Sequence, residues 1–72
     1  DISVEILKSL IESPKTRGEI ARGVSEKGFK RTTAYHYISR LEELELVEYF
    51  EENKKIYYKI TDRGKKFLEA FE

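Results

Sequence analysis

The sequence predicts a small α+β domain, mostly helical, with three helices, a two-stranded β-hairpin and a closing helix in that order. Apolar residues recur at helical spacing as far as Leu44, alternate between Val47 and Ile60, and return to helical spacing after Thr61. No segment repeats internally or is of low complexity. The 72 residues are therefore expected to form a single domain, residues 1–72.

The first helix is predicted over residues 3–12, where apolar residues from Val4 to Ile11 repeat at helical spacing. Pro14 follows and favours the end of the helix. At 72 residues the chain is near the lower limit for a domain that folds without staples, so a dimer is a reasonable expectation from size alone.

The second helix is predicted over about residues 17–26. Thr16 followed by Glu19 has the pattern of a capping box, in which each side chain binds a free backbone N–H at the helix start. Gly28 comes after the helix and can take the left-handed conformation that closes it.

The third helix, predicted over about residues 31–44, has two faces of different chemistry. Projected at about 100° per residue, the apolar side consists of Ala34, Tyr37, Ile38, Leu41 and Leu44. The opposite side carries Thr32, Tyr35, His36 and Ser39, with Arg40 at its edge and Lys30 and Arg31 at the N-terminal end. Such a face suits a helix that lies in a DNA groove, whereas a plain solvated face is the alternative for a lone helix.

A β-hairpin follows, because β-branched and aromatic residues alternate over 47–50 and 56–60 around a polar tip at 51–55. Its inward-facing set is expected to be Val47, Tyr49, Ile56, Tyr58 and Ile60. Thr61 has the pattern of an N-cap, and the helix after it has an apolar stripe of Phe67, Leu68 and Phe71.

Charge is segregated along the chain although the formal net charge is zero. Residues 15–40 hold seven cations and two glutamates, a net +5; residues 41–53 hold six glutamates and no cation. Residues 54–66 hold six cations and one aspartate, again +5. The third helix thus lies at the end of a basic segment. This local positive charge favours a nucleic-acid partner, although the total charge of zero gives no such indication.

Composition argues against several other classes. There is no cysteine, one histidine without a plausible carboxylate partner, and no glycine-rich phosphate loop, so we expect neither an enzyme nor a bound metal or cofactor. No apolar run approaches the ~20 residues that cross a bilayer, and we expect a cytoplasmic protein.

Two stretches form a specific combination at their spacing. The first is Thr33-Ala34-Tyr35, then Ile38-Ser39-Arg40-Leu41-Glu42-Glu43, then Leu46-Val47; the second is Tyr58-Lys59-Ile60-Thr61-Asp62-Arg63-Gly64-Lys65-Lys66-Phe67-Leu68. Together they resemble the recognition helix, first wing strand, last strand and closing helix of small winged helix-turn-helix transcriptional regulators. The likeness is closest to the PadR-like group and more distant to the MarR- and ArsR-like ones.

The resemblance implies a sequence-specific regulator of double-stranded DNA, with the third helix in the major groove and the 47–60 hairpin as a wing. One position departs from the family pattern, since Glu45 stands where a glycine usually ends the third helix. A non-glycine residue held in the left-handed conformation costs roughly 1 kcal/mol, so this turn is expected to differ or to carry that strain.

The DNA hypothesis assigns two kinds of contact. The phosphate contacts are Lys30, Arg31, Arg40, Arg17 and Arg22, and the residues placed to approach base edges are Thr32, Thr33, Tyr35, His36 and Ser39. Two of these have a structural alternative, because Thr32 could cap the helix and Tyr35 could support the first or second helix. Lys54 and Lys55 at the hairpin tip either reach the DNA or belong to a solvated turn beside Glu51 and Glu52.

A homodimer is expected from apolar surface that so small a domain leaves over. The proposed interface residues are Ile2, Ile6, Leu10, Phe67, Leu68 and Phe71. The alternative is that all of them belong to the monomer core. The competing function is a winged helix used for protein–protein contact within a larger assembly, which the acidic segment 42–52 would suit.

Overall fold

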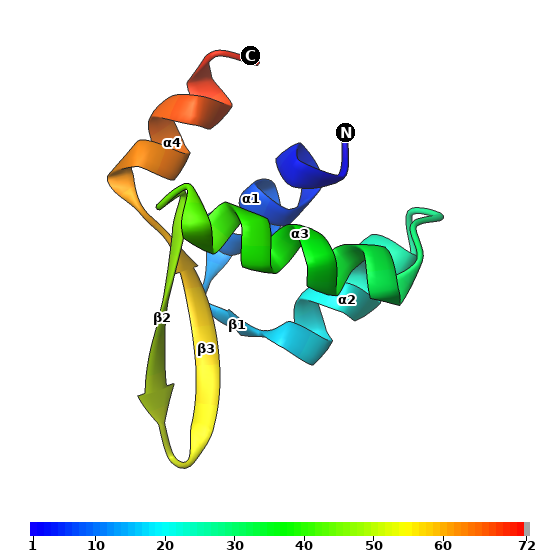
Figure 1. Ribbon diagram of the computed structural model, residues 1–72, viewed down its shortest axis with the longest axis vertical. Coiled ribbons are helices and arrows are strands. Elements are labelled where there is room, and N and C mark those ends of the chain that lie inside the picture. The colour runs from blue at the N-terminus through cyan, green and yellow to red at the C-terminus, as the bar shows by residue number, and fades with distance from the viewer. Residues whose placement is uncertain (72) are drawn as a thin grey trace.

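The computed structural model describes residues 1–71, and its elements follow the predicted order with one strand added. The four helices are α1 (Ile2–Glu12), α2 (Arg17–Ser25), α3 (Arg31–Glu43) and α4 (Asp62–Glu69). The three strands are β1 (Lys15–Thr16), β2 (Val47–Glu52) and β3 (Lys55–Ile60). The β2–β3 hairpin projects from the helical body, and its tip lies far from both chain ends (Figure 1).

The helix boundaries follow the predicted caps. The predicted capping box of α2 is present, since the Thr16 N–H donates to Glu19 Oε1 at 2.9 Å and the Glu19 N–H donates to Thr16 Oγ1 at 3.2 Å. Gly28 has a φ of 96°, the left-handed conformation expected after α2. Thr61 caps α4 as predicted, with its Oγ1 accepting from the Gly64 N–H at 3.0 Å.

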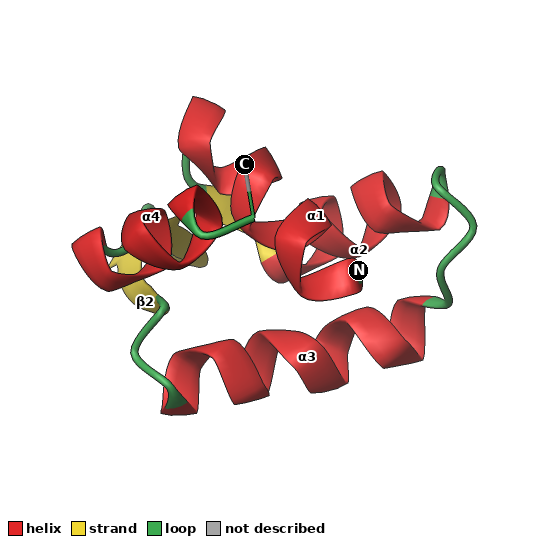
Figure 2. Ribbon diagram, turned by 90° about the horizontal axis from the view of Figure 1, so that it is seen from above, coloured by secondary structure: helices red, strands yellow, loops and turns green. Residues whose placement is uncertain are grey.

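One hydrophobic core holds the elements together. Its most deeply buried large side chains are Ile6 and Leu7 of α1, Ile20 of α2 and Ile38 of α3. Seen from above, α3 lies along one side of the molecule and the other three helices lie on its inner side (Figure 2). The opposite face of α3 is therefore left to solvent.

The sheet has three antiparallel strands in the order β1-β3-β2, where only a two-stranded hairpin was predicted. In the added pairing Lys15 lies opposite Tyr58 and Thr16 opposite Tyr57. Strand β1 was not predicted, because two residues are too few to show an alternating pattern. Both residues had been interpreted as the segment that leads into α2. Its effect is to fix the N-terminus of α2 against the hairpin.

Two residues of the predicted inward-facing set of the hairpin are exposed. The predicted face is right, since Val47 pairs with Ile60 and Tyr49 with Tyr58 in one register. However, Tyr49 and Ile56 are 56% and 44% exposed, because the hairpin extends past the helices that would cover them.

The end of α3 is a Schellman turn with a strained residue. The Glu45 N–H donates to the Glu42 carbonyl at 3.0 Å and the Leu46 N–H to the Leu41 carbonyl at 2.9 Å. Glu45 has a φ of 62°, so it carries the strain that the departure from glycine predicted. Leu44, predicted to face the core, is 51% exposed because the helix ends at Glu43 and the chain turns away.

A compact junction joins α4 to this turn. The Thr61 N–H donates to the Leu46 carbonyl at 3.1 Å, and the Thr61 hydroxyl donates to the Glu45 carbonyl at 2.7 Å. Gly64 lies directly against this turn, where an added Cβ would collide with the Leu46 carbonyl oxygen and lie 2.7 Å from Ile60 Cγ1. Among the described residues, no helix is long and apolar enough to cross a membrane.

Candidate nucleic-acid interface

The outer face of α3 contains most of the predicted contact residues. Exposed on it, or just before it, are Lys30, Arg31, Thr32, His36, Ser39 and Arg40. Thr33 and Tyr35 are half-buried at its margins, and Tyr35 packs against the core. The face therefore presents cations at its N-terminal end and hydroxyl and imidazole groups along its middle.

The N-terminus of α3 has no side-chain cap. Lys30 occupies the N-cap position without a side-chain hydrogen bond, whereas α1, α2 and α4 begin with Asp1, Thr16 and Thr61 as side-chain caps. Thr32 lies inside the helix, so the alternative that it caps α3 is wrong. The first backbone N–H groups of α3 consequently remain available to an external acceptor.

Most cations of the basic segment form no salt bridge with the part of the chain that the structure describes. Within residues 1–71, no salt bridge involves Arg17, Arg22, Lys30, Arg31 or Arg40. The other two lysines have structural partners. Lys15 Nζ donates to the Ser9 carbonyl at 2.6 Å, and Lys27 Nζ lies 3.0 Å from Glu5 Oε2.

The Lys27 pair also affects a carboxylate. The hydrogen bond from Lys27 holds the pKa of Glu5 below its ordinary value. Lys27 therefore contributes to the contact between α1 and α2. The cations of residues 15–40 that form no salt bridge within the described chain lie on α2, on α3 or, in the case of Lys30, just before α3.

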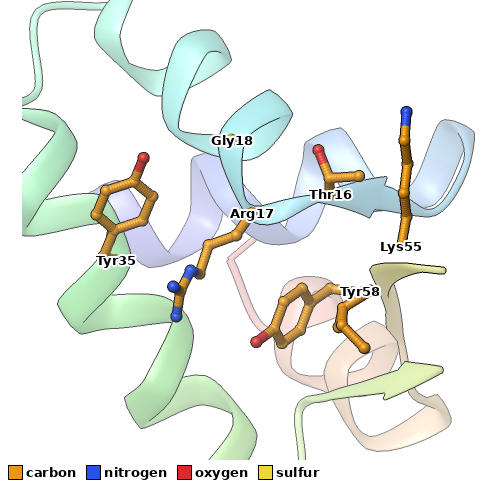
Figure 3. Close-up of a pocket in the computed structure, with 7 residues that line it drawn as sticks. Thr16, Arg17, Gly18, Tyr35, Lys55 and Tyr58 are labelled. Carbon is orange, nitrogen blue, oxygen red and sulfur yellow. The ribbon is translucent and has the colours of Figure 1, made fainter. Parts of the chain in front are cut away.

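An open hollow of about 600 Å³ separates α2 and α3 from the wing. It is lined by Thr16, Arg17, Gly18, Tyr35, Lys55, Ile56 and Tyr58 (Figure 3). The Arg17 guanidinium carbon lies 5.2 Å from the centre of the Tyr35 ring, a cation–π contact between α2 and α3. The alternative role proposed for Tyr35, support of the second helix, thus applies through Arg17.

The wing has a two-residue turn and two unlike edges. Asn53 and Lys54 have φ values of 52° and 66°, as a tight two-residue hairpin turn requires. Lys54 and Lys55 are both exposed, but only Lys55 lines the hollow. The glutamates Glu48, Glu51 and Glu52 are all on β2 and do not line that hollow, although Glu52 lies opposite Lys55 in the sheet.

A second hollow, of about 570 Å³, lies at the other edge of the wing and is acidic. Its lining includes Glu42, Glu45, Glu48 and Asp62, together with Arg63. The acidic segment 42–52 was predicted from the sequence, whereas Asp62, at the start of α4, joins it only in the folded chain. No three His, Cys, Asp or Glu side chains among residues 1–71 are grouped for metal binding.

Most of the residues predicted to form a dimer interface are not exposed on a single chain. Ile2, Ile6, Leu10 and Leu68 are at most 5% exposed within a single chain, where they form the core. Phe67 packs partly against that core, and Phe71 is 59% exposed. Ile11, which was not predicted, is also 54% exposed.

Four helices, a three-stranded sheet with a projecting hairpin, and a solvent-facing third helix define a winged-helix protein. The chain belongs to the winged helix-turn-helix family, whose model matches residues 1–72. No protein of curated function matches the sequence significantly.

Solved structures of regulators are similar over nearly the whole chain. A PadR family transcription regulator from Clostridium difficile R20291 is 29% identical, with a TM-score of 0.88 over 97% of this chain and 81% of that one. A transcriptional regulator from Clostridium thermocellum is 30% identical, with a TM-score of 0.83 over 97% and 75%.

A winged helix-turn-helix DNA-binding domain from Mycobacterium bovis, described as homodimeric and as a possible ArsR-family regulator, is 27% identical. Its TM-score is 0.71 over 97% of this chain and 62% of that one. The predicted likeness to PadR-like and ArsR-like regulators is thereby confirmed.

Proposed function

We propose that this chain is a sequence-specific regulator of transcription that binds double-stranded DNA with α3 in the major groove. The observation that carries the proposal is the outer face of α3, which is exposed, cationic at its N-terminal end and lined by small hydroxyl groups and one imidazole. A face of this kind can approach both phosphates and base edges.

The contacts divide by position along α3. Lys30 and Arg31, together with the uncapped N–H groups, lie at the end where a phosphate is best bound. Thr32, His36 and Ser39 lie further along the exposed face, where side chains reach base edges. Thr33 and Tyr35 lie at the margin of this face, and Arg22 of α2 and Arg40 of α3 are exposed cations that form no salt bridge within residues 1–71.

A homodimer is part of the proposal. Phe67 and Phe71 of the closing segment pack in a tilted arrangement with ring centres 5.0 Å apart, and Phe71 is largely exposed. Two copies joined there would place two α3 helices on one face of a duplex, about 10 base pairs apart, and would favour a palindromic site.

The test is fluorescence anisotropy of a labelled random duplex of about 25 base pairs, titrated at several salt concentrations. If a dimer makes about six phosphate contacts, log K should fall with log salt at a slope of roughly −5. Arg40→Ala should flatten this slope, whereas Lys8→Ala, which removes an exposed cation of α1, should leave it unchanged. Absence of binding by the folded protein at low salt would refute the proposal.

The acidic hollow supports a second candidate function, a winged helix that binds another protein. Glu42 and Asp62 line it and form no salt bridge within residues 1–71, so a basic partner could pair with them. This function would take first place if DNA binding is absent, and substitution of Glu42 by Gln would then weaken capture of the partner.

A further inference from the structure

We propose, on the basis of the DNA-binding function above, that Tyr35 is a positioning residue, which holds the Arg17 guanidinium ready for a phosphate of the DNA strand that passes between α3 and the wing. This role is separate from the reading of bases by α3.

The position of the hollow gives the first argument. Adjacent grooves of B-DNA are separated by one sugar–phosphate strand. If α3 lies in the major groove and the wing reaches the next groove, that strand must pass between α3 and the wing. The hollow of about 600 Å³ occupies this interval, with α2 and Tyr35 on one side and β3 on the other.

The charge of the lining gives the second argument. Arg17 and Lys55 are its two ionised residues, and no carboxylate lines it. The glutamates of the wing lie on β2 and border the acidic hollow or the solvent instead. On the wing, Lys55 of β3 lines the hollow, and Glu52, which lies opposite Lys55 in the sheet, does not line it.

The contact between Arg17 and Tyr35 gives the third argument. A free arginine loses side-chain freedom when it binds, and this loss opposes association. The Tyr35 ring, 5.2 Å from the guanidinium carbon, holds Arg17 between α3 and Tyr58 in advance (Figure 3). A guanidinium packed against a ring keeps its N–H groups free to donate to phosphate oxygens.

A DNA strand in the hollow would also explain the apolar part of its lining. Ile56 is 44% exposed and lies beside Lys55, where the body of the domain does not cover it. A deoxyribose of the crossing strand would cover this side chain. The proposal therefore explains why an exposed isoleucine lies on the inner side of the wing.

The experiment is a double-mutant cycle in the same anisotropy assay. Arg17→Ala should weaken binding about five- to tenfold near 0.1 M salt and make the salt slope less negative by about 0.9 for each copy bound. Tyr35→Leu should cause most of the same loss, and Tyr35→Phe, which keeps the ring, should restore it. In the Arg17→Ala background, Tyr35→Leu should weaken binding by less than about twofold, as expected for residues that act together.

Lysines 54 and 55 provide a matched pair on the wing. Lys55→Ala should weaken binding about five- to tenfold, whereas Lys54→Ala, at the adjacent turn position, should have a much smaller effect. Urea unfolding of every variant separates lost folding from lost binding, and Arg17→Lys, which retains the charge without the planar stacking, should keep the salt slope while lowering affinity.

The outcomes are distinct. If the wild-type protein does not bind the duplex, the DNA-binding function itself fails. If it binds but the losses from Arg17→Ala and Tyr35→Leu simply multiply, Tyr35 does not position Arg17. If Lys54→Ala is as damaging as Lys55→Ala, the wing meets DNA with its tip and the strand does not occupy the hollow.

Discussion

Replacement of Gly64 by alanine should destabilise the fold by forcing α4 away from the turn after α3. A Cβ at this position would collide with the Leu46 carbonyl oxygen and approach Ile60 Cγ1 to 2.7 Å. The oxygen belongs to the backbone, and it also accepts the Thr61 N–H at 3.1 Å. The collision therefore cannot be relieved by rotation of a side chain.

The magnitude follows from three contributions. Overpacking in a well-packed interior costs about 1–3 kcal/mol, and each hydrogen bond of Thr61 that is lost adds about 1 kcal/mol. Alanine in place of glycine in a helix returns up to about 1 kcal/mol. We expect a net loss of about 2–3 kcal/mol, which is a large share of the roughly 4–11 kcal/mol expected for a domain of this size.

The assay is urea unfolding followed by far-UV circular dichroism, with thermal unfolding as a second measurement. A loss of about 2–3 kcal/mol should lower the melting temperature by at least about 10 °C in so small a domain. Gly23→Ala is the matched control, because an added Cβ there meets no atom within 4 Å and the position is inside α2. That variant should gain up to about 1 kcal/mol.

The reasoning would be refuted if Gly64→Ala were within about 0.5 kcal/mol of the wild type, the range of ordinary surface substitutions. If Gly64→Ala and Gly23→Ala raised the free energy of unfolding equally, α4 could move away from the turn, and the hydrogen bonds of Thr61 would not fix its position.

Three further predictions concern single residues. Glu45→Gly should raise stability by up to about 1 kcal/mol, because glycine tolerates the φ of 62° and the exposed pair with Arg63 contributes little; a lower urea midpoint would contradict this. Lys30→Ser should supply the missing cap of α3 and add about 1 kcal/mol, while DNA affinity falls about five- to tenfold; unchanged affinity would exclude a phosphate at this end. The pKa of Glu19 is held below its ordinary value of 4.5, chiefly by the Thr16 backbone N–H. Its contribution is therefore complete above that value and lost as pH falls through the lowered one, so melting curves of Glu19→Gln should depend less on acid than those of the wild type.

Much of the fold could be predicted from local signals. The capping box at Thr16 and Glu19, the glycine at position 28 and the N-cap at Thr61 each depend on a few neighbouring residues, and each is present. The strand β1 could not be found in this way, because its partners in β3 are about forty residues distant and its own two residues show no alternation.

The errors in burial have one common cause. A projection at helical or alternating spacing says which side a residue faces but not where the neighbouring element ends. Leu44 lies beyond the last helical residue of α3, and Tyr49 and Ile56 lie beyond the helices that cover the base of the hairpin. In each case the predicted side of the element is right, but no neighbouring element covers the residue.

The candidate site, too, could be predicted from the sequence only in part. The exposed residues of α3 could be identified from its polar face, since exposure follows from the helical period. The contact of Arg17 with Tyr35 could not be, because it depends on how α2 crosses α3. Likewise, that Lys55 lines the hollow and Lys54 does not depends on the hairpin register and its turn.

The free edge of the sheet has a consequence for contacts between copies of the chain. β2 is the outer strand, so its N–H and carbonyl groups could recruit a second β2. An antiparallel pairing of two β2 strands centred on Phe50 would set Glu48 of each copy opposite Glu52 of the other. Like charges directly opposite one another destabilise such ladders. The glutamates of β2 thus disfavour this edge-to-edge pairing of two copies, in addition to any contact that they make with a partner.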